Sequence, residues 1–156
     1  MGGELAELLG AWWFHYDEWD EKRLRGLVTD DVRFTCRTDS GTTDYEEFVR
    51  VDAVGVDEVM AWQRDHRRGS PYPLRHNGSN VHVTATTGGV VEFASYIFVT
   101  KTVDGRPLAL SSGTASGKVV RTEVGWRIAQ LDIVLDTTDS QQYGDLVADD
   151  QLESRA

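Results

Sequence analysis

The sequence is poor in cysteine, in basic residues and in long apolar runs. Cys36 is the only cysteine among 156 residues, so no intrachain disulfide can form and no cysteine-based metal site is possible. No apolar run approaches the roughly 18 residues that indicate a membrane helix. The opening Met-Gly-Gly-Glu lacks the basic region of a signal peptide. We therefore expect a protein of the reducing cytoplasm that does not bind a membrane.

The scarcity of basic charge excludes a second class of partner. Lys and Arg number 16 against 26 Asp and Glu, which gives a formal net charge of -10. The densest basic cluster, residues 64–68, is short and contains an acid. Binding to nucleic acid needs clustered Lys and Arg that neutralise phosphates, so we expect no nucleic-acid partner. A hydrophobic content of 40% over this length fits one soluble domain with a sizeable core.

Apolar spacing in the first half of the chain predicts helices around one strand. Residues 29–31, Thr-Asp-Asp, are expected to form a turn, and Gly55 permits a break in the last of these helices. Prolines at 71 and 73 end that helix. The expected elements are an aromatic helix over 4–16, a short helix over 20–28 with Asp20 as its N-cap, a strand over 32–38 and a helix over 45–67.

The second half of the chain is nearly all strand in pattern. Turns at Gly88-Gly89, Asp104-Gly105 and residues 123–125 separate four runs. This order predicts an α+β fold, in which helices pack on one face of a curved antiparallel sheet. We expect residues 1–138 to form one domain and residues 139–156 to form an acidic, frayed tail. The four expected strands cover 80–87, 90–103, 108–122 and 126–137.

Three stretches carry a resemblance to a known family. They are residues 16–32, residues 75–81 (Arg-His-Asn-Gly-Ser-Asn-Val) and residues 125–136, which include Gly-Trp-Arg-Ile and Asp-Ile-Val-Leu-Asp. In this order they resemble the SnoaL-like branch of the nuclear-transport-factor-2-like superfamily. The resemblance implies a cone-shaped barrel with one deep pocket, and a homodimer or homotrimer. The superfamily contains dehydratases, isomerases, polyketide cyclases and non-catalytic domains, so the fold does not fix a reaction.

The resemblance also implies a catalytic pair. In dehydratase and dehydrochlorinase members, an Asp at the position of Asp17 orients a His at the position of His76. A buried carboxylate that accepts from one ring nitrogen fixes the tautomer and stabilises the imidazolium formed at the other. The structural alternative is that Asp17 is a solvated acid at a helix end and His76 a strand histidine. Tyr16 and Tyr96 are candidate donors to a substrate carbonyl or leaving group, although the inward face of the strand at Tyr96 is not derivable.

Aromatic residues predict the character of the pocket wall. A wall rich in aromatic side chains favours a flat or polycyclic apolar ligand, while core packing explains any one of these residues equally well. In scytalone dehydratases the strand matching residues 108–118 carries Ser and Asn donors, whereas here Gly113 and Ala115 take those positions, which suggests room for a bulkier ligand. The predicted pocket residues are Trp13, Trp19, Phe34, Tyr45, Trp62, Tyr72, Phe98, Ser112 and Thr114.

We expect neither a metal ion nor a cofactor. His82 follows His76 by six residues, so both could share a strand face, but no His-x-His or His-Glu-x-x-His spacing occurs. His15 and His66 are interpreted as surface-helix residues.

Two functions follow from the resemblance. The first is a cofactor-independent lyase or isomerase, similar to dehydratases and polyketide cyclases, that uses an Asp17–His76 general base on a small hydrophobic oxygenated molecule. The second is the non-catalytic small (β) subunit of an aromatic-ring-hydroxylating dioxygenase, which residues 76–81 and 133–136 also resemble. A ligand-binding domain without chemistry is a third reading.

Overall fold

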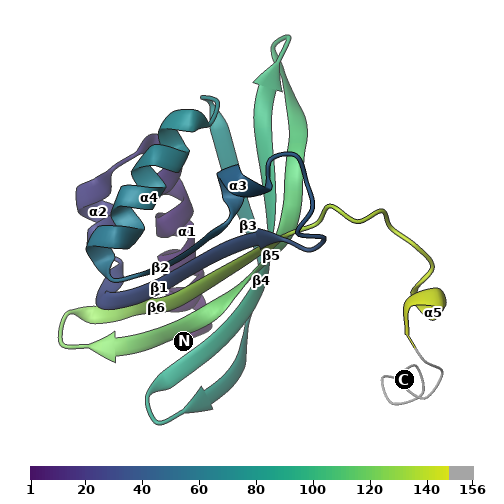
Figure 1. The fold of residues 1–156 in the computed structure, drawn as a ribbon. Helices are drawn as coiled ribbons and strands as arrows, with labels where there is room; N and C mark the ends of the chain where they lie inside the picture. Colours follow the sequence, from purple (N-terminus) through teal and green to yellow (C-terminus); the bar gives the residue numbers. More distant parts are fainter. Residues whose placement is uncertain (148–156) are drawn as a thin grey trace.

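Helices gather in the first half of the chain and long strands in the second (Figure 1). The computed structural model describes residues 1–147. The helices are α1 (Gly2–Glu18), α2 (Glu21–Arg25), α3 (Glu46–Val49), α4 (Val56–Gly69) and α5 (Tyr143–Leu146). The strands are β1 (Val28–Thr38), β2 (Val51–Val54), β3 (Leu74–Thr87), β4 (Val90–Val103), β5 (Arg106–Thr122) and β6 (Gly125–Leu135).

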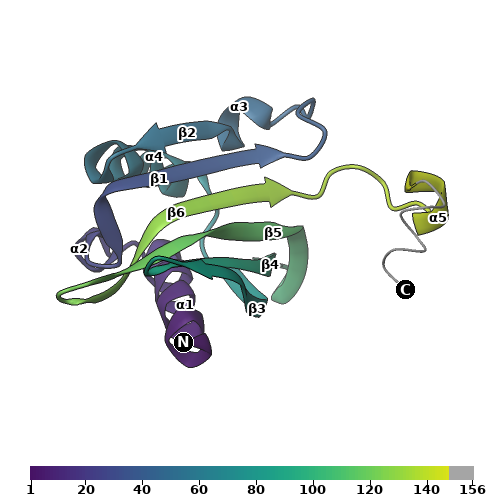
Figure 2. The ribbon, with the colours of Figure 1, turned by 90° about the horizontal axis from the view of Figure 1, so that it is seen from below.

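All six strands form one curved sheet, with the order β2-β1-β6-β5-β4-β3. Neighbouring strands run antiparallel except β1 and β6, which pair in parallel from the two halves of the chain. Figure 1 shows α1, α2 and α4 together on one side of this curved sheet, and Figure 2 shows α4 near β1 and β2 and α1 near β3. The predicted α+β fold with helices on one sheet face is confirmed, and the parallel β1–β6 pair is a feature that the expected antiparallel sheet lacked.

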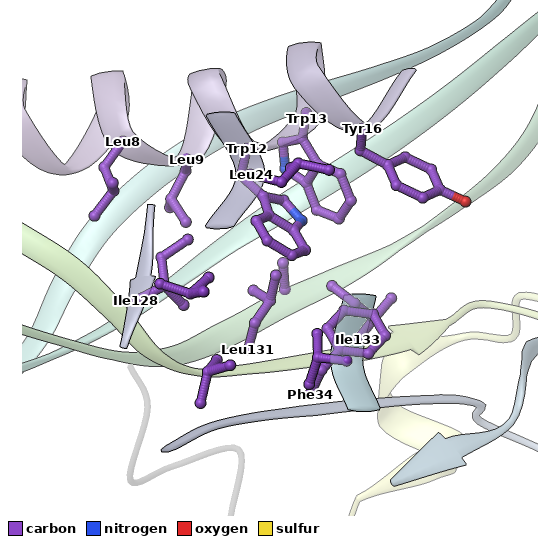
Figure 3. Close-up of a cluster of buried hydrophobic side chains, with 14 of the residues drawn as sticks. Leu8, Leu9, Trp12, Trp13, Tyr16, Leu24, Phe34, Ile128, Leu131 and Ile133 are labelled. Carbon is purple, nitrogen blue, oxygen red and sulfur yellow. The ribbon is translucent and has the colours of Figure 1, made fainter. Parts of the chain in front are cut away.

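The core forms where the apolar face of α1 meets the sheet. Leu5, Leu9 and Trp12 recur at helical spacing and are at most 3% exposed. Figure 3 shows the α1 side chains pointing toward Ile128 and Leu131 of β6. Burial of an aliphatic or aromatic side chain is worth about 1.5–3 kcal/mol, so this face anchors α1 firmly on the sheet. The last turn of α1, which carries the candidate site, is thereby held in place.

The helix expected over residues 45–67 is wrong in its first half. That segment contains α3, the short strand β2 and then α4. β2 alternates between the buried Ala53 and the exposed Asp52 and pairs antiparallel with β1, where Arg33 forms a two-point ion pair with Asp52. Gly55 makes the turn into α4 with φ at 94°, a backbone conformation that residues with a side chain rarely adopt. Pairing with β1 therefore overrides the helical spacing.

The second predicted helix is shorter than expected. Asp20 does act as its N-cap, since its Oδ1 accepts from the Arg23 N–H at 3.1 Å. The helix ends at Arg25, and residues 29–31, expected to form a turn, lie within β1. The pairing of β1 with β6 shifts register between Val28 and Arg33, so the polar Thr-Asp-Asp stretch is an irregular part of a strand.

The pleat of β4 decides which of its residues face the helices. Phe93, Ile97 and Val99 are buried, whereas Tyr96 is 58% and Phe98 is 45% exposed on the opposite face. Because the side-chain period of a strand is two, the whole even-numbered set faces outward. The expected homodimer or homotrimer, which would use such an outer face, stays a prediction.

The chain leaves the sheet after β6, and the segment that carries α5 extends away from the helices and the sheet (Figure 1). The division at residue 138 also stays a prediction, and the part of the predicted tail over 148–156 lies outside the described residues. Within residues 1–147, no helix is both long and apolar enough to cross a membrane.

Candidate active site

A cavity of about 280 Å³ lies between the helices and the concave face of the sheet. Most of its lining is aromatic or aliphatic, and no Lys, Arg, Asp or Glu side chain lines it within the described part of the chain. Such a cavity is near the lower limit of the size range for small-molecule sites. The lining residues are Trp13, Tyr16, Phe34, Cys36, Tyr45, Phe48, Val49, Trp62, Gln63, His66, Ser70, Pro71, Leu74, His76, Ile97, Val99, Leu110, Ser111, Ile133 and Leu135.

Asp17 and His76 meet at the C-terminal end of α1. The Asp17 carboxylate accepts twice from His76: Oδ2 lies 2.8 Å from the backbone N and Oδ1 lies 2.6 Å from ring Nδ1. The side chains are 6% and 13% exposed, respectively. A carboxylate only accepts hydrogen bonds, so Nδ1 carries a proton, and in the neutral imidazole Nε2 then holds the lone pair. The arrangement leaves a basic nitrogen on a ring that lines the cavity.

Two contacts fix the orientation of this pair. The buried Arg67 of α4 donates from Nε to the backbone oxygen of Asp17 at 2.9 Å, and from Nη1 to the oxygen of Pro71 at 3.1 Å. It thereby supplies a partner for a carbonyl at the end of α1 that has none within the helix. Trp13, one turn before Asp17, stacks on the His76 ring at 4.8 Å with planes 5° apart. Both partners of the pair are therefore held by buried neighbours.

Tyr16 places an unpaired hydroxyl at the same cavity. The residue is 3% exposed, its ring meets His76 edge-on at 5.4 Å, and its Oη has no hydrogen-bond partner among the described residues. Ser70, which lines the same cavity, lies near enough to act on the pKa of Tyr16, but no hydrogen bond forms between them, and Ser70 donates its own proton to the His66 oxygen at 2.7 Å. Burial raises the pKa of Tyr16 above its usual range, so its hydroxyl stays a donor. In Figure 3 the hydroxyl points away from the apolar cluster.

His66, expected on the helix surface, lines the cavity instead. Its Nδ1 lies 3.0 Å from the backbone oxygen of Phe48, and its ring stacks on Trp62 at 4.5 Å. Burial lowers the pKa of His66 below its usual range. The signal that could have found it is the i,i+4 spacing from Trp62, because a predicted pocket residue one turn away shares its helix face.

Only some of the predicted pocket residues line the cavity. Trp13, Phe34, Tyr45 and Trp62 do. Trp19 ends α1 in a left-handed conformation at φ 53° and packs edge-on against Tyr16 outside the cavity.

The candidate donors and wall residues on exposed surfaces lie elsewhere. Tyr72 is 63% exposed, and its hydroxyl donates to Glu18 at 2.9 Å. Tyr96 and Phe98 lie outside the cavity because the pleat of β4 turns them to the outer face. Tyr96, a candidate donor, therefore lies on the face of β4 that is turned away from the cavity lining.

β5 presents different residues to the cavity than expected. Ser112 and Thr114 are exposed, and Ser112 donates to Asp136 at 2.9 Å. An irregularity in the β4–β5 pairing after Val99 lets the consecutive residues Leu110 and Ser111 both line the cavity. A side chain on Gly113 would collide with the backbone oxygen of Val134, so close strand approach, and not a bulkier ligand, accounts for that glycine.

His82 lies apart from the Asp17–His76 pair. His82 is exposed, and its Nδ1 lies 3.2 Å from the Asn80 oxygen on the outer part of β3. A pairing shift between Ser79 and His82 separates it from the face of His76. Across residues 1–147 no three His, Cys, Asp or Glu side chains are grouped as metal ligands.

Comparison with known proteins gives a family and a fold. The SnoaL-like domain profile matches residues 3–132. No functionally curated protein matches the sequence. An NTF2-like protein with a cystatin-like fold from Novosphingobium aromaticivorans is 19% identical, with a TM-score of 0.69, over 92% of this chain and 86% of that chain.

Two further structures from the same organism carry provisional functional descriptions. One, provisionally described as a scytalone dehydratase, is 13% identical with a TM-score of 0.65, over 88% of this chain and 86% of its own. The other, provisionally described as the β subunit of an aromatic-ring-hydroxylating dioxygenase, is 13% identical with a TM-score of 0.68, over 91% and 93%. At these identities the similarity is one of fold alone.

Proposed function

Because the chain belongs to the SnoaL-like family, we propose that it is a cofactor-independent enzyme of the lyase or isomerase type. It dehydrates, cyclises or shifts a double bond in a small hydrophobic oxygenated molecule. The observation that supports this most strongly is the 2.6 Å contact between Asp17 Oδ1 and His76 Nδ1 at the wall of an apolar cavity. Asp17 holds the ring proton at Nδ1 of His76, so Nε2 is available on the cavity side as a general base.

For a β-hydroxyketone the proposed reaction is a base-assisted loss of water. Nε2 of His76 takes the proton from the carbon next to the carbonyl, and the C–H electron pair forms the enolate. The imidazolium, stabilised by Asp17, then returns that proton to the β-hydroxyl while the C–O bond breaks and the new C=C bond forms. Water leaves and His76 is neutral again, so the step needs no oxidant or metal.

Tyr16 fits the role of oxyanion donor in this reaction. Its hydroxyl has no partner among residues 1–147, lines the same cavity and keeps its proton because burial raises its pKa. A preorganised donor aimed at the carbonyl oxygen stabilises the negative charge that develops there. The aromatic and aliphatic wall excludes water, which strengthens both interactions.

The β-subunit reading is the second candidate, since a structural neighbour carries that description. A non-catalytic subunit has no need of a buried carboxylate that holds an imidazole with its other nitrogen free. The pair therefore favours the enzyme over the subunit and over a ligand-binding domain.

A neutral bicyclic β-hydroxyketone offers a direct test. Loss of water from 3-hydroxy-1-tetralone gives 1-naphthol, which is fluorescent, and the parent 1-tetralone reports α-proton exchange in D₂O by NMR. We expect the wild type to accelerate at least one of these reactions over buffer, and His76→Gln to lose about 100-fold or more of that rate.

The matched control is Tyr96→Phe, which removes a tyrosine hydroxyl from the outer face of β4 and should leave the rate unchanged. A His76→Gln variant as fast as the wild type would overturn the base mechanism. If the wild type binds 1-tetralone but accelerates neither reaction, the binding-domain reading leads. If it neither binds 1-tetralone nor turns it over, and co-purifies with an iron–sulfur subunit, the dioxygenase reading leads.

A further inference from the structure

The cavity holds a second imidazole that the proposed reaction does not use. His66 lies in the last turn of α4, and its Nδ1 is 3.0 Å from the Phe48 backbone oxygen. A carbonyl oxygen only accepts, so Nδ1 carries the ring proton and Nε2 keeps a lone pair. Among the described residues, Nε2 of His66 has no hydrogen-bond partner. The nitrogen is an acceptor left open on a residue of the cavity lining.

Aromatic neighbours hold the ring of His66 in one orientation. Trp62 stacks on it at 4.5 Å with planes 15° apart, and Phe48 at 4.3 Å with planes 26° apart. A half-turn flip of the ring would break the bond to Phe48, and tilting the ring plane would also break both stacking contacts. The open nitrogen therefore has a fixed direction, which is a condition for selective recognition of one ligand group.

The charge state of His66 decides what kind of group it recognises. Burial lowers its pKa, and the nearby His76 and Arg67 act in the same direction, while the bond to Phe48 acts against them. A histidine with a lowered pKa is neutral at pH 7, so Nε2 accepts a hydrogen bond and does not donate one. A ligand hydroxyl or N–H satisfies this nitrogen, whereas a carbonyl or ether oxygen does not.

Tyr16 lies next to both histidines. Its ring centroid is 6.4 Å from that of His66 and 5.4 Å from that of His76. All three side chains line the same cavity. A flat ligand that lies against Tyr16 is therefore within reach of both imidazoles.

We propose that Nε2 of His66 is a specificity-determining acceptor for a hydroxyl group on the substrate, which makes the preferred substrate a neutral hydroxylated aromatic ketone. The placement of the ketone at His76 and Tyr16 rests on the proposed function. The hydroxyl then lies at the other end of the ring system. Neutrality follows from the cavity wall, because no Lys, Arg, Asp or Glu side chain of the described chain lines it to pair with a charged ligand.

Ligand binding without turnover tests this assignment. The ligands are 1-tetralone and three hydroxy-1-tetralone isomers that carry the hydroxyl at different positions of the aromatic ring. Affinities are measured by calorimetry at a pH where the phenols are un-ionised. We expect the wild type to bind at least one isomer about 3- to 10-fold more tightly than 1-tetralone, the value of one neutral hydrogen bond.

His66→Phe keeps a flat ring against Trp62 but removes the acceptor, so that this preference should fall to about onefold. His82→Phe, the same replacement at an exposed histidine on β3, is the matched control and should retain the preference. The inference is overturned if the wild type does not distinguish any isomer from 1-tetralone. It is also overturned if His66→Phe discriminates as well as the wild type does.

A measurement on the unaltered protein covers the case in which His66→Phe does not fold. In long-range ¹H–¹⁵N spectra, the signal of the unprotonated Nε2 of His66 should move upfield on addition of the preferred isomer and stay in place with 1-tetralone. An equal response to both ligands would overturn the inference and leave His66 only a structural role, as a contact between α4 and α3. Neither measurement needs catalysis. The acceptor role of His66 can therefore be confirmed while the base mechanism of His76 fails, and the base mechanism can be confirmed while the acceptor role fails.

Discussion

The two histidines of the cavity differ in the group that holds them. His76 donates to a carboxylate that can stabilise a positive imidazolium, whereas His66 donates to a neutral backbone carbonyl. Both rings stack on a tryptophan, Trp13 or Trp62, and both keep Nε2 free of a protein partner within residues 1–147. The difference of partner predicts a division of labour. We expect the histidine beside a carboxylate to take protons and the histidine beside a carbonyl to accept hydrogen bonds.

Replacing the Asp17 carboxylate should abolish this difference and cause the largest loss of rate. Asp17→Asn keeps the size of the side chain and its acceptor for the His76 backbone N–H, but the amide cannot stabilise an imidazolium. It can also donate to Nδ1, which moves the ring proton to Nε2. We expect a fall of about 100-fold or more in the rate of α-proton exchange from 1-tetralone, followed by NMR in D₂O. A variant within a few-fold of the wild type would contradict the role of Asp17.

Removing the support behind Asp17 should cost both stability and rate. Arg67→Met keeps the buried stem but removes the donors to the backbone oxygens of Asp17 and Pro71. Each buried acceptor left without a partner costs about 1–3 kcal/mol, so the midpoint of urea denaturation should fall. Exchange should also slow at temperatures where the variant is folded, because the end of α1 loses its anchor. Arg68→Met, at the exposed neighbouring position, is the control.

The Tyr16 hydroxyl should matter for catalysis and not for folding. Tyr16→Phe removes an oxygen that has no hydrogen-bond partner among the described residues. Its loss leaves no protein group unpaired, so the free energy of unfolding should stay the same or rise. The rate of α-proton exchange should fall about 10-fold or more, in line with loss of one oxyanion donor. A variant that loses stability and keeps its rate would make Tyr16 a packing residue only.

The smallest expected effect is a pH dependence of stability that comes from His66. The pKa of His66 is lowered in the folded protein, whereas an unfolded histidine takes a proton near about pH 6.5. Below that pH the unfolded chain binds more protons at this position than the folded chain does. The free energy of unfolding should therefore decrease as the pH is lowered, until the pH passes the folded pKa. Urea denaturation between pH 7.5 and 5 should show a shallower decline in His66→Phe than in the wild type. Equal slopes would show that His66 protonates as easily in the fold.

Much of the fold follows from sequence patterns, and the exceptions have physical causes. The aromatic face of α1 and the turns that divide β3 to β6 are readable because spacing and Gly-containing turns coincide. The segment 45–67 is not, because β2 exists only through its pairing with β1. That pairing brings together residues far from any local pattern.

The candidate site divides in the same way. Asp17 and His76 follow from the family resemblance, and their meeting depends on α1 lying across the start of β3. The phase of β4 could not be predicted, since Phe93 and Ile97 on one face are as apolar as Tyr96 and Phe98 on the other. His66 escaped notice because a lone histidine in a polar helix segment resembles a surface residue. Its ring is covered in part by Phe48 of α3, a contact that the local pattern of α4 does not reveal.

The tautomer of His76 at neutral pH tests the central claim most directly. Long-range ¹H–¹⁵N correlation spectra, assigned by comparison with His76→Gln, report which ring nitrogen carries the proton. The account predicts a protonated Nδ1, held by Asp17, and an unprotonated Nε2 facing the cavity. A proton on Nε2 would place a donor where the reaction needs a base, and would contradict general-base catalysis by this pair.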